Sequence, residues 1–350
     1  MNEYSNRWEK ILKDTTPQMS EYRKTLRGTD KEVMMSLFTT FELSFQHLLI
    51  LEKERQQNFP NLLTLLSFFH SGYIPLELFY AYCAPEFSGK DGQGLSLDQG
   101  HKAIAQSGIK EGPSQPHKPP TTGLNINHVP GAYICMSNGQ WDAENLSDAF
   151  IILSQLSLAE LNFQSVGDRL GHVSLNSLIR DWIRLRTPRD ACPGYSSLAA
   201  ACVFRLLLWN RERSRIYYEE PAARQRLVHH INTYIKNIVE ISPGQNSTAF
   251  EVPFDDSGRP ALEFCYLLFR HGHFPRSEVW CRRSLAMRQA QFGLGNPLTL
   301  TSLNNLSMVL HVEQQFIETT HIQKQILDIK ARIFGEADSV CLNLSSKYNF

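Results

Sequence analysis

The sequence lacks a net charge, a C-x-x-C cysteine pair and a long hydrophobic run. Lys plus Arg and Asp plus Glu are equal at 35 each in 350 residues, so no global field attracts the chain to nucleic acid or to an acidic membrane. The cysteines number seven, which is odd, and they are scattered. This pattern favours reduced thiols in an intracellular protein. The polar first residues and the Pro- and Gly-broken run from Gln56 to Leu76 favour neither a secretory signal nor a membrane span. We expect a cytoplasmic protein.

Motifs of catalysis are also missing from the sequence. A phosphate-binding loop needs G-x-x-x-x-G-K-[ST], but Gly89-Lys90 has Ala84 in place of the first Gly and Asp91 in place of Ser or Thr. The pair His229-His230 has no G-x-S-x-G or reactive-cysteine context nearby, and we expect one of these histidines to face the core and the other the solvent. The sequence therefore predicts no enzyme and no cofactor.

A metal site has one weak candidate. Cys265, His271, His273 and Cys281 lie close together in the sequence, and thiolates and imidazoles are zinc ligands. Their spacing matches no zinc motif, however. We expect the two cysteines to lie on facing helices of one hairpin, where a small apolar side chain is wanted. The prediction is no metal site.

The first half of the chain shows helical periodicity in several short segments and one hairpin pattern. Residues 1–32 predict a helix followed by a polar connector. Residues 161–163 and 173–175 alternate apolar with polar around a Gly-containing turn, which indicates a β-hairpin. The further helices are expected at Val33–Leu51, Asn61–Phe69, Pro75–Tyr82, Leu146–Leu158 and Ser177–Leu185. Three helices, a hairpin and a helix are the parts of a winged-helix domain.

An irregular segment interrupts this domain. Gly and Pro supply 14 of the 47 residues from Pro85 to Gly131, and no period survives there. We place a disordered insertion at 85–140. It is either a real surface loop or sequence foreign to the fold, such as a retained intron.

A winged helix raises the question of DNA binding. The helix that would enter the major groove, from Asn145 to Glu160, contains no Lys or Arg, so the phosphate backbone would repel it. A basic cluster follows it, formed by Arg180, Arg184, Arg186 and Arg189. Arg180 and Arg184 are spaced as on a solvated helix face. We expect no nucleic-acid binding.

The second half of the chain contains two long helices and then a repeat. Ser196–Arg213 and Pro221–Ile241 read as helices, and a polar connector follows them. Apolar residues between Ala261 and Leu342 then recur at a constant spacing of 42 residues, for example Phe264 and Leu306, or Phe274 and Phe316. Each copy predicts a pair of helices joined by a turn, which must stack on a neighbouring pair to bury its apolar stripe. A third copy begins at Leu342 and is truncated.

The repeat resembles the tetratricopeptide repeats (TPRs) of kinesin light chains. The resemblance rests on Gly293-Leu-Gly-Asn-Pro-Leu-Thr-Leu300 followed by Thr-Ser-Leu-Asn-Asn-Leu306, with Asn296 and Ser307 in place of the usual His and Ala. It covers about residues 261–345. It implies that Asn305, with Asn304 beside it, lines a concave peptide-binding groove and hydrogen-bonds a peptide backbone. The alternative is that Asn305 bonds between helices inside the stack.

Residues 1–241 resemble what precedes such repeats in fungal NB-ARC–TPR proteins, which are NLR-like signalling ATPases. The similar segments are Thr40–Phe45, Asn61–Phe68, Leu153–Leu158 and Val173–Trp182. Asn176 occupies the place of a histidine that approaches the nucleotide phosphates in that family. Because the phosphate-binding loop is missing, the chain looks like the C-terminal half of such a protein.

These observations predict a mainly α fold, with a winged-helix-like domain followed by a truncated α-helical TPR superhelix. We expect an N-terminal helix and connector at 1–32, the winged-helix-like domain at 33–189, a helical connector at 190–257 and repeats at 258–350. The expected function is a non-catalytic protein–protein interaction module that binds a protein or peptide in its groove and self-associates. A winged-helix transcription regulator with a TPR sensor and a kinesin-light-chain-like adaptor are the alternatives. The adaptor is disfavoured because coiled-coil heptads are absent from the sequence.

Overall fold

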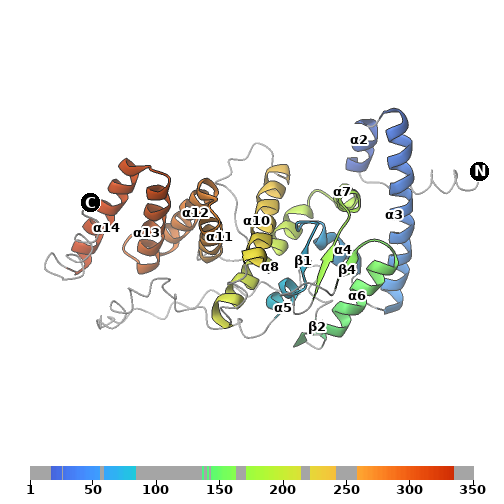
Figure 1. Cartoon of the computed structure of the whole chain (residues 1–350), viewed down its shortest axis with the longest axis horizontal. Helices are drawn as coiled ribbons and strands as arrows, with labels where there is room; N and C mark the ends of the chain where they lie inside the picture. The colour runs from blue at the N-terminus through green and yellow to red at the C-terminus, as the bar shows by residue number, and fades with distance from the viewer. Residues whose placement is uncertain are drawn as a thin grey trace, which may run out of the picture. The chain divides into compact units, whose positions relative to one another are not determined.

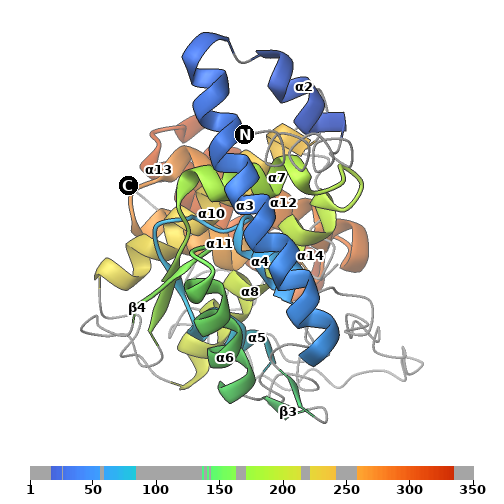
Figure 2. The same ribbon diagram turned by 90° about the vertical axis from the view of Figure 1, so that its right-hand side faces the viewer.

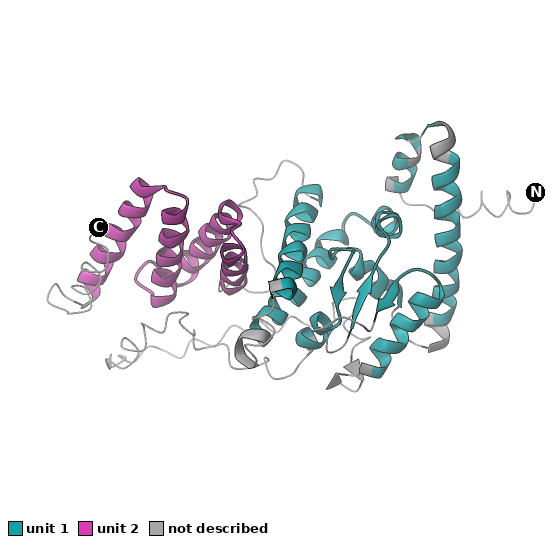
Figure 3. Cartoon of the chain, in the orientation of Figure 1, with its two compact units in different colours: residues 1–85, 125–250 teal, residues 86–124, 251–350 magenta. Residues whose placement is uncertain are grey.

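The structure is a computed structural model, and it describes residues 17–25, 27–55, 59–83, 136–137, 140–141, 143–162, 171–213, 221–241 and 258–334. These residues are mainly helical, as the sequence predicts (Figures 1 and 2). They divide into two compact units (Figure 3). Unit 1 contains the described residues up to 241, and unit 2 contains those from 258 to 334.

Unit 1 contains eight of the described helices and all of the described strands. The helices are α2 (Pro17–Thr25), α3 (Gly28–Arg55), α4 (Phe59–Leu66), α5 (Glu77–Cys83), α6 (Ala143–Gln155), α7 (Ser177–Arg186), α8 (Cys192–Arg213) and α10 (Pro221–Ile241). The strands are β1 (Ile74–Pro75), β2 (Met136–Ser137), β3 (Gln140–Trp141), β4 (Glu160–Asn162) and β5 (His172–Ser174). The expected helices are thus confirmed within a few residues at their ends.

The predicted hairpin is confirmed by the pairing of β4 with β5. The two strands are antiparallel, with Leu161 opposite Val173. β1 adds to the other side of β5, so the sheet order is β1-β5-β4. Ile74 and Val173 are fully buried, so the sheet presents an apolar side to the core of unit 1.

An aromatic cluster attaches α3 to α7. The buried ring of Trp182 lies 5.7 Å from that of Phe41 and 5.8 Å from that of Phe45. The Arg186 guanidinium covers the Phe45 ring at 3.9 Å and pairs with Glu42 at 3.1 Å. Aromatic contacts and a cation over a ring each stabilise such a junction by about 1 kcal/mol.

The N-terminal region differs from the sequence prediction at α2. The polar connector expected before residue 33 was wrong at α2, which is a helix because Met19 is buried and Tyr22 stacks on Phe38 at 5.9 Å. The helix expected around Trp8 lies outside the described residues.

One segment of α3 is long and apolar enough to cross a membrane by length and composition. This segment is Glu32–Leu51, and 28% of its most apolar window is buried.

The expected insertion at 85–140 falls almost entirely outside the described residues. Its end is an exception, because β2 and β3 pair with Met136 opposite Trp141 and Ser137 opposite Gln140. Disorder was therefore the wrong prediction for residues 136, 137 and 140. The Gly and Pro content that suggested disorder falls after Gly131, and Gly139 is the one Gly or Pro from 132 to 140.

Unit 2 consists of four helices that form two successive hairpins. They are α11 (Arg259–Arg270), α12 (Phe274–Phe292), α13 (Pro297–Val312) and α14 (Phe316–Phe334). Both bounds of α12 recur in α14 after 42 residues, which confirms the repeat in this part of the chain. The third copy, from Leu342, lies outside the described residues.

Candidate protein-binding surface

The two hairpin turns of unit 2 have the same geometry. In the first turn, Gly272 has a positive φ of 75° and His273 N–H donates to the Leu268 carbonyl at 2.9 Å. In the second turn, Gln314 has a φ of 61° and Gln315 N–H donates to the Leu310 carbonyl at 2.9 Å. The turns lie 42 residues apart, so the repeat extends to backbone conformation.

Apolar side chains fill the space between the two helices of each hairpin. In the first hairpin, the rings of Phe264 and Trp280 meet edge to face at 5.0 Å and are both buried. Leu306 and Ile322 occupy the corresponding positions in the second hairpin and are also buried. This burial holds α11 on α12 and α13 on α14.

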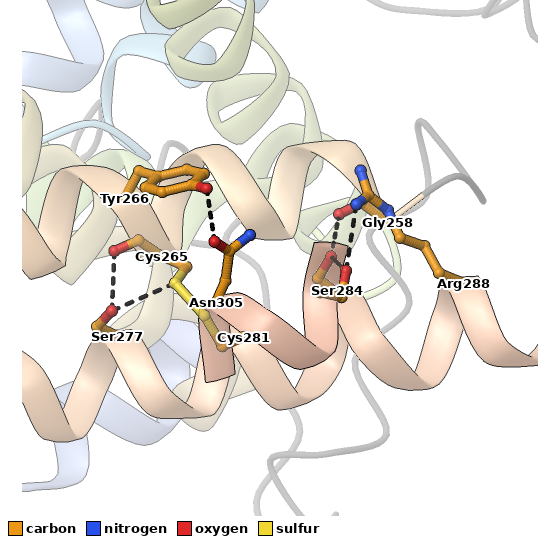
Figure 4. The surroundings of a disulfide bond; sticks show 9 residues. Gly258, Cys265, Tyr266, Ser277, Cys281, Ser284, Arg288 and Asn305 are labelled. Carbon is orange, nitrogen blue, oxygen red and sulfur yellow. Dashed lines mark hydrogen bonds between the residues drawn. A yellow bond between two sulfur atoms is a disulfide. The ribbon is translucent and has the colours of Figure 1, made fainter. Parts of the chain in front are cut away.

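A disulfide links the helices of the first hairpin (Figure 4). Cys265 on α11 and Cys281 on α12 are bonded, with a Cα–Cα distance of 5.6 Å. Ser277 donates its hydroxyl to the Cys265 carbonyl at 2.9 Å beside this bond. The prediction of reduced thiols was therefore wrong for this pair. The sequence placed both cysteines on facing helices, but it gave no reason to expect their positions to come within bonding distance.

The same bond removes two of the four candidate metal ligands. Cys265 and Cys281 are bonded to each other, so neither supplies a thiolate to a metal. Among the described residues, no group of three or more His, Cys, Asp and Glu is arranged to hold a metal ion. His271 and His273 flank the glycine of the first turn.

Buried polar groups join the two hairpins to each other. Arg288 on α12 is 4% exposed and donates to the Leu298 carbonyl at 3.0 Å and to Ser302 at 3.2 Å on the next hairpin. Thr299 donates its hydroxyl to the Arg288 carbonyl at 3.2 Å. The Ser284 hydroxyl shares a hydrogen bond of 3.2 Å with the Ser302 hydroxyl on α13. These bonds, of which those from the Arg288 guanidinium are charge-assisted, fix the register of one hairpin on the other.

A second connection between the hairpins is ionic and more exposed. Arg282 on α12 pairs with Glu278 at 2.6 Å on its own helix and with Glu318 at 2.8 Å on α14. The hydrogen bond with Glu318 raises the pKa of Arg282, and the same bond lowers the pKa of Glu318. Burial and a hydrogen bond with Glu278 raise the pKa of Glu313 at the nearby turn. Because Arg282 and Glu318 are about two-fifths exposed, this network contributes little to stability.

The outward sides of α11 and α13 form what we call the α11–α13 face. We define it by the residues that are exposed or half-buried at helical spacing on these two helices: Arg259, Tyr266, Arg270, Thr301, Asn304, Met308 and Val312. The outward positions of α11 recur on α13 after 42 residues, where Met308 occupies the position of Tyr266 and Val312 that of Arg270. The face therefore combines an apolar strip with amide, hydroxyl and guanidinium groups.

The two predicted site residues differ in their exposure. Asn304 is half-buried on the α11–α13 face. Asn305 is 6% exposed, and its Oδ1 accepts a hydrogen bond of 2.8 Å from the Tyr266 hydroxyl of the preceding hairpin (Figure 4). Its Nδ2 donates to none of the described atoms. Asn305 thus makes the bond between helices that the sequence left as the alternative to peptide contact, while its amide donor remains unsatisfied.

Sequence reasoning missed Tyr266 and Met308. The repeat could have identified them, because Tyr266 and Met308 lie 42 residues apart and neither belongs to the buried apolar positions. Tyr266 was overlooked because an aromatic residue at helical spacing reads as a core residue.

The histidines of unit 1 divide as expected. His229 is exposed, and His230 is 2% exposed. The ring of His230 accepts the backbone N–H of His70 at Nδ1 over 3.1 Å. Burial and the neighbouring His70 lower the pKa of His230 to about 3, against an opposing contribution from a hydrogen bond with the Tyr73 backbone. His230 is therefore a neutral core residue near pH 7.

The basic cluster of unit 1 is paired with carboxylates, and of its four arginines only Arg189 is largely exposed. Arg180, Arg184, Arg186 and Arg189 each pair with a carboxylate, at distances of 2.9, 3.3, 3.1 and 3.5 Å. Arg184 also donates to the Ser67 carbonyl at 2.9 Å and to Asn237, so the expectation of a solvated face was wrong for this residue. Asn176 caps α7 by accepting the Leu178 N–H at 2.9 Å.

No protein-family model, curated protein or solved structure matches the chain.

Proposed function

We propose that the chain is a non-catalytic protein–protein interaction module in which unit 2 binds a segment of another protein on the α11–α13 face. The observation that carries this proposal is the repetition of the face, whose outward positions on α11 recur on α13 after 42 residues, with the two helices joined by the Tyr266–Asn305 bond. Repeated hairpins bind other chains through such extended surfaces. The similarity to tetratricopeptide repeats supports the same function.

The chemistry of the face suits a polypeptide. Met308 and Val312 are more than two-fifths exposed and offer apolar contact area. Asn304 has an amide that both donates and accepts, so it can bond the backbone of a peptide of any sequence. Two arginines at the ends of α11 add charge-assisted donors.

Unit 1 supports the proposal through its topology and its charges. From α4 to β5, and apart from the short pair β2–β3, its order of elements is helix, strand, two helices and two strands, with the sheet order β1-β5-β4. We assign it as a winged-helix-like unit, similar to the regulatory half of an NB-ARC–TPR signalling protein. Because all four arginines of its cluster pair with carboxylates and three of them are mostly buried, we propose a protein rather than a nucleic-acid partner. We propose the cytoplasm as its location and no membrane partner.

A peptide-display selection on the full chain tests the binding surface. We expect enrichment of peptides that bind the wild type with micromolar affinity and lose about tenfold or more in affinity to Met308→Glu. Val279→Glu is the matched control, since Val279 on α12 is 49% exposed and Met308 is 43% exposed. Equal losses in both variants, or no enriched peptide, would contradict the proposal.

A titration with ATP and ADP tests the non-catalytic part. We expect no saturable binding and no turnover, because the sequence holds no phosphate-binding loop. Saturable micromolar binding with phosphate release would overturn this part of the proposal.

A further inference from the structure

The first hairpin of unit 2 carries a cross-link that the second hairpin lacks. Cys265 and Cys281 correspond to Ser307 and Gln323 after 42 residues. The second hairpin nevertheless has the same turn and the same apolar filling. The repeat fold is therefore compatible with either pair of residues, and the disulfide is an addition to this hairpin rather than a requirement of it.

The position of the disulfide connects it to the proposed binding surface. Cys265 is followed directly by Tyr266, the residue of α11 that bonds Asn305 on α13 (Figure 4). A bond that restrains Cys265 against α12 therefore also restrains the Tyr266 side chain. The α11–α13 face depends on this restraint, because the Tyr266–Asn305 bond joins α11 directly to α13, whereas the bonds of Arg288 and Arg282 start from α12.

We propose that the Cys265–Cys281 disulfide is a reversible redox lock on the α11–α13 face. The disulfide form holds α11 on α12 and keeps Tyr266 on Asn305. The dithiol form leaves the first hairpin folded, because the Phe264–Trp280 and Phe269–Phe274 pairs and the Ser277 and Ser284 hydrogen bonds remain. It opens more often, because the covalent restraint between α11 and α12 is lost. This inference rests on the proposed function only in the claim that the α11–α13 face binds a polypeptide; the redox change of the hairpin does not depend on it.

The chemistry is thiol–disulfide exchange with a glutathione-type couple. A glutathione thiolate attacks one protein sulfur, breaks the S–S bond and releases the other cysteine as a thiolate. A second glutathione thiolate then attacks the mixed disulfide, forms glutathione disulfide and releases the remaining cysteine. The two protons lost by the glutathione thiols end on Cys265 and Cys281, so two electrons pass to the protein. Oxidation is the reverse sequence.

Burial makes the lock responsive to occupancy of the face. Cys265 is 1% exposed and Cys281 is fully buried, so a thiolate reaches them only when the hairpin opens. A ligand that holds α11 against α13 slows this opening. By linkage, the disulfide form then binds that ligand more tightly by the same factor by which the ligand stabilises the disulfide.

The test compares the full chain after incubation with oxidised or reduced glutathione. Alkylation under denaturing conditions, read peptide by peptide in a mass spectrometer, is expected to leave Cys265 and Cys281 unlabelled after oxidation and to label both after reduction. Hydrogen exchange is then followed on both forms without any ligand. We expect the amides of α11 to exchange about 100-fold faster in the dithiol form, from the closure of a loop of this length, and those of α13 near Asn305 to accelerate as well.

Two variants separate the lock from a general effect of reduction. Cys265→Ser with Cys281→Ala should exchange like the reduced wild type in both buffers, whereas Cys192→Ser with Cys202→Ser in unit 1 should keep the full redox response. If the first variant does not fold, hydrogen exchange of the reduced wild type is compared directly with that of the oxidised wild type.

Labelling of Cys265 and Cys281 after oxidation would overturn the proposal, as would equal exchange in both forms. Because no ligand is used, these outcomes are independent of the display selection. A chain that shows the lock but selects no peptide refutes only the proposed function.

Discussion

The hydroxyl of Tyr266 donates a hydrogen bond of 2.8 Å to Oδ1 of Asn305, which lies 39 residues later on the next hairpin. This bond joins the first helices of two successive repeats, whereas the ion pair between Arg282 and Glu318 joins their second helices. The stack is thus held by directional bonds on both of its layers, in addition to its apolar core. Stability and the geometry of the proposed binding face therefore depend on the same residues.

A double-mutant cycle on Tyr266 and Asn305 should show that they are coupled. Tyr266→Phe leaves the buried Oδ1 of Asn305 without its donor and is expected to lower the free energy of unfolding of unit 2 by about 1–2 kcal/mol. Asn305→Ala should cost a similar amount, and the double variant less than the sum by about 1 kcal/mol. Hydrogen exchange of the α13 amides measures these values. Strict additivity would show that the bond contributes nothing.

Exchanging the turn residues between the hairpins should shift stability in opposite directions. Gln314 holds a φ of 61° where the first hairpin has Gly272 at 75°, and a side chain at such a φ costs about 1–2 kcal/mol. Gln314→Gly should therefore raise the free energy of unfolding by about 0.5–1 kcal/mol after the entropy of the added glycine is deducted. Gly272→Gln should lower it by about 1 kcal/mol. Denaturant unfolding measures both, and a loss in both variants would contradict the strain argument.

Gly258→Ala should destabilise the start of the first hairpin. Gly258 has a φ of 68°, and an added Cβ would lie 2.8 Å from the Ser284 carbonyl oxygen. We expect a loss of about 2–3 kcal/mol from the φ and the clash. Gly194→Ala is the control, because an added Cβ there meets nothing within 4 Å and lies in helix α8. Thermal unfolding followed by circular dichroism should show a loss only for Gly258→Ala.

Acid should destabilise unit 1 through His230. Its pKa is lowered to about 3 in the folded chain, against an ordinary value of 6.5. The unfolded chain therefore binds the extra proton as the pH falls from 6.5 towards 3, and folding stability falls through this window by about 1.4 kcal/mol per pH unit. Urea unfolding at pH 7.5 and pH 5.5 should show a loss of about 1.4 kcal/mol from this residue. The loss should disappear in His230→Leu and persist in His47→Gln, a change of an exposed residue on α3.

Periodicity predicted the elements of this fold well where burial follows one face of a helix. The helices of unit 2 and the β4–β5 pairing belong to this group, since apolar spacing and turn residues agree there. The short helix α2 was missed because its two contact residues, Met19 and Tyr22, are too few to show a period.

Contacts between segments distant in sequence were not accessible in the same way. The Cys265–Cys281 distance depends on the rotation of two helices about their axes, and the spacing of cysteines in a sequence does not determine this rotation. The Tyr266–Asn305 bond depends likewise on how one hairpin lies on the next. For Asn305 the sequence suggested two roles, a hydrogen bond between helices and a contact with a peptide. The structure contains the first, and the second stays a prediction.

Each hairpin of unit 2 closes on a ring pair only five residues apart, Phe269 with Phe274 at 5.4 Å and His311 with Phe316 at 5.5 Å. Contacts so near in the chain form early, since little loop entropy is lost in making them. Either hairpin can therefore fold first and provide the surface on which the other folds. The hairpin that is synthesised first need not be the first to fold. A substitution that slows one nucleus would redirect the folding route instead of blocking it.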